Sequence, residues 1–309
     1  MKTRIWTALI ALYIVWGSTY LAIRFAVETI PPFLMAGTRF LISGLILYVW
    51  RRLAGDPAPT LRQWGSAAIM GVLLLLGGNG VVSWAEQHVP SGIAALMVAS
   101  IPLWMAVIDA VRPGGSKPDR RIVLGLLVGF GGLALLVTET QGLTPADRLD
   151  TAAVLALVLA AFLWSLGSVY SRDAEMPKSS LMGTGIEMLA GSAGLFVAAT
   201  LSGEWQALDL VAIRPASILG LVYLVAFGSL IGFVAYAWLL RNAPLSLVST
   251  YAYVNPVIAI FLGAWLGSEL INTPIIVAAL VIIGSVVLIN LSRQSRIPPE
   301  EGVALNAAD

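Results

Sequence analysis

The strongest constraint on the fold is an internal repeat, because the second half of the chain carries landmarks of the first half at a constant spacing. A shift of 154 residues superposes Trp84 on Trp238, Pro90 on Pro244, Pro102 on Pro256 and Gly78 on Gly232. A repeated unit of this length folds twice, and the two copies pack against each other. The sequence therefore predicts two similar halves that share an interface.

Both halves are too apolar for a soluble repeat protein. Hydrophobic residues make up 58% of the chain and charged residues 11%, whereas soluble domains carry about 25% charged residues. A helix of roughly 20 apolar residues crosses a bilayer, and stretches near that length occur ten times, near residues 5–27, 33–50, 64–85, 91–111, 121–139, 151–171, 180–201, 215–240, 245–267 and 271–292. We predict an all-α integral membrane protein with ten transmembrane helices.

The distribution of Lys and Arg predicts how these spans are oriented. Fourteen of these residues fall in the N-terminal segment, the even-numbered connections and the C-terminal tail, against only Arg148 and Arg214 in the odd-numbered connections. By the positive-inside rule, both termini are cytoplasmic. Each half holds five spans, so the second half begins on the opposite side of the membrane and the repeat is inverted. The predicted domains are residues 1–145 and 146–296, followed by a disordered cytoplasmic tail, residues 297–309.

Four short motifs occur in order along the chain. They are Trp16-Gly17-Ser18-Thr19-Tyr20, Pro31-Pro32 followed by Arg39, Pro90 with Pro102, and Gly267-Ser268-Glu269. Together they resemble the EamA family of the drug/metabolite transporter superfamily, over residues 5–292. The resemblance implies a ten-helix fold whose central cavity is lined by spans 1, 3, 4, 6, 8 and 9. It also implies export of small metabolites, often amino acids, and it leaves the substrate open because members of the family differ in what they carry.

The third span is the most polar of the ten. Asn79, Ser83 and Glu86 are spaced at i, i+4 and i+7, which places them on one face of a helix. Lipid cannot satisfy such groups, so they point into protein or water. Two interpretations of Glu86 stay open: it belongs to the wall of the substrate path as a partner for a cation or a proton, or it lies at the outer headgroup level and is solvated.

Several aromatic residues sit too deep in their spans to belong to an interfacial belt. Such side chains stack on an aromatic substrate or hold a cation, although core packing explains any one of them equally well. We predict that one cavity is lined by Trp16, Tyr20, Asn79, Ser83, Trp164, Ser168, Tyr251 and Asn255, with Glu86 as a further substrate-binding candidate.

Two prolines lie in the middle of spans at matching places in the two halves. Pro102 and Pro256 each remove a backbone hydrogen bond, and we predict helix breaks there that line the cavity and take part in gating. The resemblance places the second helix of each half outside the cavity, so Arg39 and Glu187 are expected to be structural. Glu269 is expected to cap the start of the tenth span.

The chain lacks the motifs of most catalytic chemistry. It has no cysteine, no recognisable metal-ligand set, no nucleophile–base pair and no nucleotide-binding loop. We therefore expect no metal, no cofactor and no enzymatic reaction.

The predicted function is a secondary transporter of the bacterial inner membrane that works by alternating access. It would export small metabolites, most simply amino acids or related neutral or zwitterionic compounds. Export of organic cations through Glu86 is the alternative, and a membrane enzyme and a passive channel are further ones. The expected partners are a small-molecule substrate and the lipid bilayer, and nucleic acid is not among them. The sequence does not fix the oligomeric state, for which a monomer is the simplest expectation.

Overall fold

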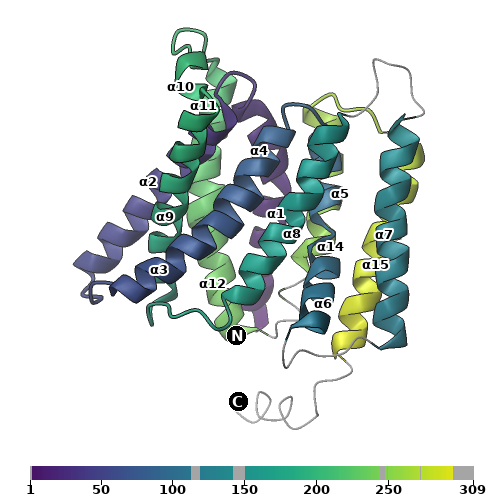
Figure 1. Ribbon diagram of the computed structural model, residues 1–309, viewed down its shortest axis with the longest axis horizontal. Coiled ribbons are helices and arrows are strands. Elements are labelled where there is room, and N and C mark those ends of the chain that lie inside the picture. The colour runs from purple at the N-terminus through teal and green to yellow at the C-terminus, as the bar shows by residue number, and fades with distance from the viewer. Residues whose placement is uncertain are drawn as a thin grey trace.

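A computed structural model describes residues 2–112, 119–141, 150–243, 248, 250–271 and 273–294 (Figure 1). Every regular element within these residues is a helix, which confirms the all-α fold class for this part of the chain. Pro244, the predicted domain boundary at residues 145 and 146, and the predicted tail at 297–309 lie outside it.

The helices of the first half are α1 (Lys2–Ala26), α2 (Pro32–Leu53), the series α3 (Leu61–Met70), η1 (Gly71–Gly80) and α4 (Val81–Ala85), the pair α5 (Ser91–Val98) and α6 (Ile101–Val111), and α7 (Arg120–Gln141). Those of the second half are α8 (Thr151–Tyr170), α9 (Ser180–Leu201), the short α10 (Glu204–Ala207), the series α11 (Pro215–Tyr223), η2 (Leu224–Ile231) and α12 (Gly232–Asn242), α14 (Tyr251–Leu266) and α15 (Thr273–Gln294).

Seven of these helices or series are long and apolar enough to cross a membrane, judged by length and composition. They are Thr3–Ala26, Pro32–Leu53, Leu61–Ala85, Ser91–Val111, Thr151–Tyr170, Ser180–Leu201 and Pro215–Tyr236, and two shorter apolar helices are Tyr251–Leu266 and Ile275–Ile289. Large apolar side chains point outward from α7, α14 and α15: Leu127 is 69% exposed, Phe261 62% and Leu280 69%. Lipid solvates such side chains, whereas water would not.

The helices pair across the two halves. Helix α2 packs most extensively against α9, and α7 packs next most extensively against α15; Figure 1 shows these two pairs at opposite ends of the molecule. Between them, α1 contacts α14 and the series α11–η2–α12, while α8 contacts the series η1–α4 and the pair α5–α6. The first helix of each half therefore packs against the third and fourth spans of the other half.

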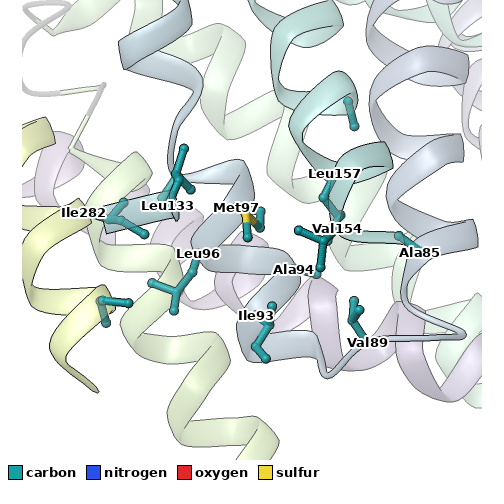
Figure 2. Close-up of a cluster of buried hydrophobic side chains, with 14 of the residues drawn as sticks. Ala85, Val89, Ile93, Ala94, Leu96, Met97, Leu133, Val154, Leu157 and Ile282 are labelled. Carbon is teal, nitrogen blue, oxygen red and sulfur yellow. The ribbon is translucent and has the colours of Figure 1, made fainter. Parts of the chain in front are cut away.

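The largest apolar cluster lies on the α8 side of this interface. It joins α5 and α6 to α7, α8 and α15, and Figure 2 shows Leu96, Met97, Leu133, Val154 and Ile282 converging there. These side chains are at most 5% exposed. The cluster fixes one side of the molecule as a packed core, so the space available to a substrate lies elsewhere along the interface.

Carboxylates from the connections bind helix N-termini of the opposite half. The Glu204 carboxylate accepts hydrogen bonds from the backbone N–H groups of Phe33, at 3.2 Å, and Leu34, at 2.8 Å, at the start of α2. Burial raises the pKa of Glu204, and the two hydrogen bonds oppose that shift by stabilising the ionised form. A carboxylate in this place satisfies donors that have no partner within the helix.

The connection after α2 makes the corresponding contact with α9. Arg51 donates from Nε and Nη2 to the two carboxylate oxygens of Asp56, at 2.9 and 2.8 Å. Asp56 also hydrogen-bonds Ser179, which caps α9 by accepting from the Met182 N–H. The hydrogen bond from Arg51, followed by the one from Ser179, lowers the pKa of Asp56 below its usual value.

The two prolines that were predicted to break helices behave differently. The fourth span is interrupted at Ala99 and Ser100, directly before Pro102, which is the second residue of α6. Pro256, by contrast, lies inside the continuous helix α14, so the predicted break there is wrong. Proline removes one backbone donor, and the remaining hydrogen bonds of α14 hold the helix together around it.

Two π-helical segments, which the sequence analysis did not predict, occur in the third span and in its counterpart in the second half. They are η1 and η2, and the 154-residue shift places η1 at residues 225–234, over most of η2. π-Helical turns are rare and are frequent at functional sites. Within the fold, η1 packs against α8 and η2 packs against α1.

Candidate functional site

A cavity of about 90 Å³ lies where the two halves meet, with room for several water molecules. Its wall comes from α1, α2, the third and fourth spans, α8, α12 and α14. The residues that line it are Trp16, Thr19, Tyr20, Ile23, Arg39, Gly78, Asn79, Val82, Val98, Ile101, Ala160, Ala161, Trp164, Phe233, Tyr251 and Asn255. The predicted residues Trp16, Tyr20, Asn79, Trp164, Tyr251 and Asn255 are all in this wall.

Trp16 is the centre of an aromatic cluster on one side of the cavity. Its ring centroid lies 5.5 Å from that of Phe233 and 5.1 Å from those of Tyr236 and Tyr251, mostly in edge-on or tilted arrangements. The indole Nε1 donates a hydrogen bond of 3.2 Å to the backbone oxygen of Gly228 in η2. The cluster holds a rigid aromatic surface against the cavity.

Each deep tryptophan packs on a glycine of the opposite half. A Cβ atom on Gly78, in η1, would lie 2.7 Å from Cε3 of Trp164 on α8, and one on Gly232, the first residue of α12 directly after η2, would overlap Nε1 of Trp16 on α1. Gly78 and Gly232 are the pair that the repeat aligns. Only glycine permits approaches this close, so the two glycines and the two tryptophans form matching contacts in the two halves.

The polar residues predicted on the third span divide between two environments. Asn79 lies in the cavity wall, followed along the helix by Val82. Ser83 is buried outside the wall and donates to the backbone oxygen of Asn79 at 2.8 Å. On α8, Ser168 likewise donates to the backbone oxygen of Trp164, at 2.8 Å, one turn beyond the wall. The prediction that Ser83 and Ser168 line the cavity is therefore wrong, because each hydroxyl is bound to its own helix.

Glu86 agrees with neither of its two interpretations. Its side chain is fully buried rather than solvated, and it does not line the cavity. Both carboxylate oxygens lack a hydrogen-bond partner within the described residues. The guanidinium of Arg24 donates instead to the backbone oxygen of Glu86, at the C-terminal end of α4. The residue is a buried acidic group close behind the cavity.

Arg39 is the main correction to the predicted site. It was expected outside the cavity lining, yet its side chain is 3% exposed and forms part of the wall. The resemblance assigned α2 to the periphery, but a long side chain reaches further than its helix. The guanidinium crosses to η2, where Nε donates to the Ser229 hydroxyl at 2.9 Å.

Glu269 also differs from its predicted role. Its carboxylate accepts from the backbone N–H groups of Ser91, at 2.7 Å, and Gly92, at 3.1 Å. It therefore caps α5, in the first half, and not the start of the tenth span. The cap requires α14 and α5 to be neighbours, which is a tertiary contact that sequence spacing does not reveal.

Sequence reasoning missed the other residues of the wall, which are Thr19, Ile23, Arg39, Gly78, Val82, Val98, Ile101, Ala160, Ala161 and Phe233. Thr19 and Arg39 stand in the motifs and Gly78 is a landmark of the repeat, so these three had a signal in the sequence. The others are ordinary apolar residues of membrane helices, and only their position identifies them. Within the described residues, no group of His, Asp and Glu side chains is arranged to hold a metal ion.

The sequence profile of the EamA-like transporter family matches the chain twice, over residues 4–138 and 151–291. The chain belongs to the EamA-like transporter family. It is 41% identical over 288 residues to the Escherichia coli K12 protein named as an uncharacterized inner membrane transporter, YedA, with 93% of this chain and 90% of that protein covered.

A second relative of this EamA-family chain is the uncharacterized transporter YvbV of Bacillus subtilis 168. The two are 24% identical over 308 residues, which cover 99% of this chain and 98% of YvbV. A crystal structure of another protein, 20% identical, superposes with a TM-score of 0.63 over 94% of this chain and 99% of the other. That similarity shows a shared fold, and the family match points to transport rather than to an enzymatic reaction.

Proposed function

We propose that this protein is a secondary transporter of the bacterial inner membrane that exports small amino-acid-like metabolites by alternating access. In this proposal ten helices cross the membrane as two inverted five-helix repeats, and both termini are cytoplasmic. The observation that carries the proposal is the cavity between the halves, with Trp164 packed on Gly78 and Trp16 packed on Gly232.

The exchange of contacts between the halves supports a two-fold relation between them, which an inverted repeat requires. A two-fold axis in the membrane plane would place the first span of each copy against the third and fourth spans of the other. It would also place the second spans against each other, and the fifth spans likewise. The contacts of α1 and α8, and the pairs α2–α9 and α7–α15, follow this pattern. Rocking of one repeat against the other would then expose the cavity to each side in turn.

The side chains in the cavity wall favour a small solute that has both an apolar part and a polar group. Trp16, Trp164, Phe233 and Tyr251 supply aromatic surface, while Asn79 and Asn255 supply hydrogen-bonding amides. Organic cations fit less well, because the wall contains no Asp or Glu side chain among the described residues. The inner-membrane location in the proposal is supported by the relative YedA, whose name describes it as an inner membrane transporter.

Counterflow in proteoliposomes tests the proposal. Vesicles that contain the purified protein are loaded with a mixture of amino acids and diluted into a trace of one labelled amino acid at a time. We expect transient accumulation of at least one label, and its loss in Gly232→Ala, whose Cβ would overlap Trp16. Accumulation that matches empty vesicles for every amino acid would refute the substrate class. Accumulation at channel-like rates without exchange would refute alternating access.

A further inference from the structure

Arg39 is a membrane-buried cation in the cavity wall that makes no direct ion pair. Its side chain is 3% exposed, and no carboxylate lies within 4 Å of the guanidinium among the described residues. The buried Glu86 carboxylate acts on it only from a greater distance. A buried charge without a counter-ion in direct contact is costly, because neither lipid nor apolar protein replaces its hydration. A residue of this kind in a transport cavity points to a ligand that brings the missing charge.

The contacts of the guanidinium leave one side of it open. Nε donates to the Ser229 hydroxyl at 2.9 Å, and the guanidinium carbon lies 4.7 Å from the ring centroid of Phe40. Nη2 lies near Gly228, where a Cβ atom would come within 3.1 Å of it. Ser229 and Phe40 thus hold the guanidinium in place, and Arg39 contributes to the cavity wall from this position.

The geometry identifies the charge that the site would accept. Paired N–H donors of a fixed guanidinium match the two oxygens of a carboxylate. Arg39 is the one charged side chain in the described part of the wall, which suits a single negative charge better than a phosphate dianion. Asn255 belongs to the same wall, and its amide oxygen is buried without a hydrogen-bond partner.

We propose that Arg39, oriented by Ser229, binds the carboxylate of the transported molecule, and that Asn255 accepts a hydrogen bond from its amino group. The inference rests on the proposed function and narrows its substrate class to compounds with a free carboxylate. It makes Ser229 a positioning residue, since it contacts Arg39 rather than the substrate. We therefore expect binding to weaken by a similar factor when the ligand loses its carboxylate and when residue 39 loses its charge.

Equilibrium binding to the purified full-length protein in nanodiscs tests this directly. The signal is tryptophan fluorescence, because Trp16 and Trp164 line the cavity. The probes are the proteinogenic amino acids and, for those that bind, the corresponding amino acid amides. We expect the amide to bind about 10- to 100-fold more weakly than the acid, the range expected for hydrogen bonds to charged groups.

Variants at the site complete the test. Arg39→Gln is expected to weaken the acid about 10- to 100-fold and to leave the amide within about 2-fold. Arg39→Lys keeps the charge without the paired donors, and Ser229→Ala frees the guanidinium, so each is expected to weaken the acid by about 3- to 10-fold. The matched control is Arg24→Gln, another intramembrane arginine, which contacts the Glu86 backbone outside the wall. It is expected to leave both affinities within about 2-fold.

The outcomes separate this proposal from the proposed function. Equal affinity for acid and amide, no saturable response to any amino acid, or an unchanged preference in the Arg39 variants would overturn the role of Arg39, even if counterflow succeeds. Conversely, acid-selective binding that depends on Arg39 without any counterflow would retain the site and refute transport. If Arg39→Gln is not monodisperse after purification, the affinities of Arg39→Lys and Ser229→Ala test the proposal instead, because both variants retain a positive charge at residue 39.

Discussion

Replacement of Gly78 by alanine tests whether the contact between η1 and Trp164 shapes the cavity. The added Cβ would lie 2.7 Å from Cε3 of Trp164, whereas carbon atoms in van der Waals contact are about 3.5–4.0 Å apart. The indole must therefore move by about 1 Å. Because Trp164 lines the cavity, we expect the indole to move into it and to reduce the volume that a substrate can occupy.

The expected loss of stability follows from two opposing terms. Overpacking a well-packed site costs about 1–3 kcal/mol, and alanine recovers up to about 1 kcal/mol over glycine within a helix. The net destabilisation is between about 0 and 3 kcal/mol, which corresponds to a melting temperature lower by up to roughly 12 °C. Thermal unfolding of the purified protein in detergent measures it, and tryptophan fluorescence at the same time reports the displaced ring.

Gly65 provides the control, because it lies on α3, in the same helical series, with nothing within 4 Å of an added Cβ. Gly65→Ala is expected to raise the melting temperature slightly. In a Trp164→Leu background, Gly78→Ala is expected to lose its penalty, since the clash is removed. If Gly78→Ala stabilises the parent protein as much as Gly65→Ala does, the close contact with Trp164 does not exist and the reasoning fails.

Three further predictions concern topology, energy coupling and pH. Ala58 and Ala212 are exposed, and the 154-residue repeat aligns them. Because the chain has no cysteine, a single cysteine at either position can be labelled selectively, and we expect labelling from the cytoplasm at residue 58 and from the periplasm at residue 212. Labelling of both positions from the same side would exclude inversion. Because Glu86 lies outside the cavity wall, Glu86→Gln is expected to leave substrate affinity in nanodiscs within about 2-fold. If an imposed pH gradient drives accumulation in the parent and not in Glu86→Gln, proton coupling runs through this residue and simple exchange is wrong. The lowered pKa of Asp56 means that its carboxylate stabilises the fold above the unfolded pKa, near 4, and that this contribution disappears as the pH falls through the lower folded value. Melting temperatures of the parent and Asp56→Asn should therefore differ at pH 7, draw together as the pH falls below about 4, and converge only below the lowered folded pKa. A difference that does not shrink over this range would contradict the reasoning.

The ranges of the membrane helices could be predicted from the sequence because they depend on local composition. The predicted stretch 151–171 is observed as Thr151–Tyr170, and 180–201 as Ser180–Leu201. A run of about 20 apolar residues satisfies its backbone within itself, whatever surrounds it. Deep tryptophans and asparagines were also recognisable, because their size or polarity is costly in lipid unless protein covers them. For this reason Trp16, Trp164, Asn79 and Asn255 were predicted in the wall where they lie.

Tertiary structure alone decided which of the remaining polar groups face the cavity. Ser83 and Arg39 illustrate this in opposite directions: the short hydroxyl returns to its own backbone, while the long guanidinium crosses from α2 to Ser229 on η2. Glu269 reaches α5 across 177 residues of sequence in the same way. A sequence pattern fixes the face of a helix on which a residue lies, but the reach of a side chain and the neighbour it meets depend on how the helices pack.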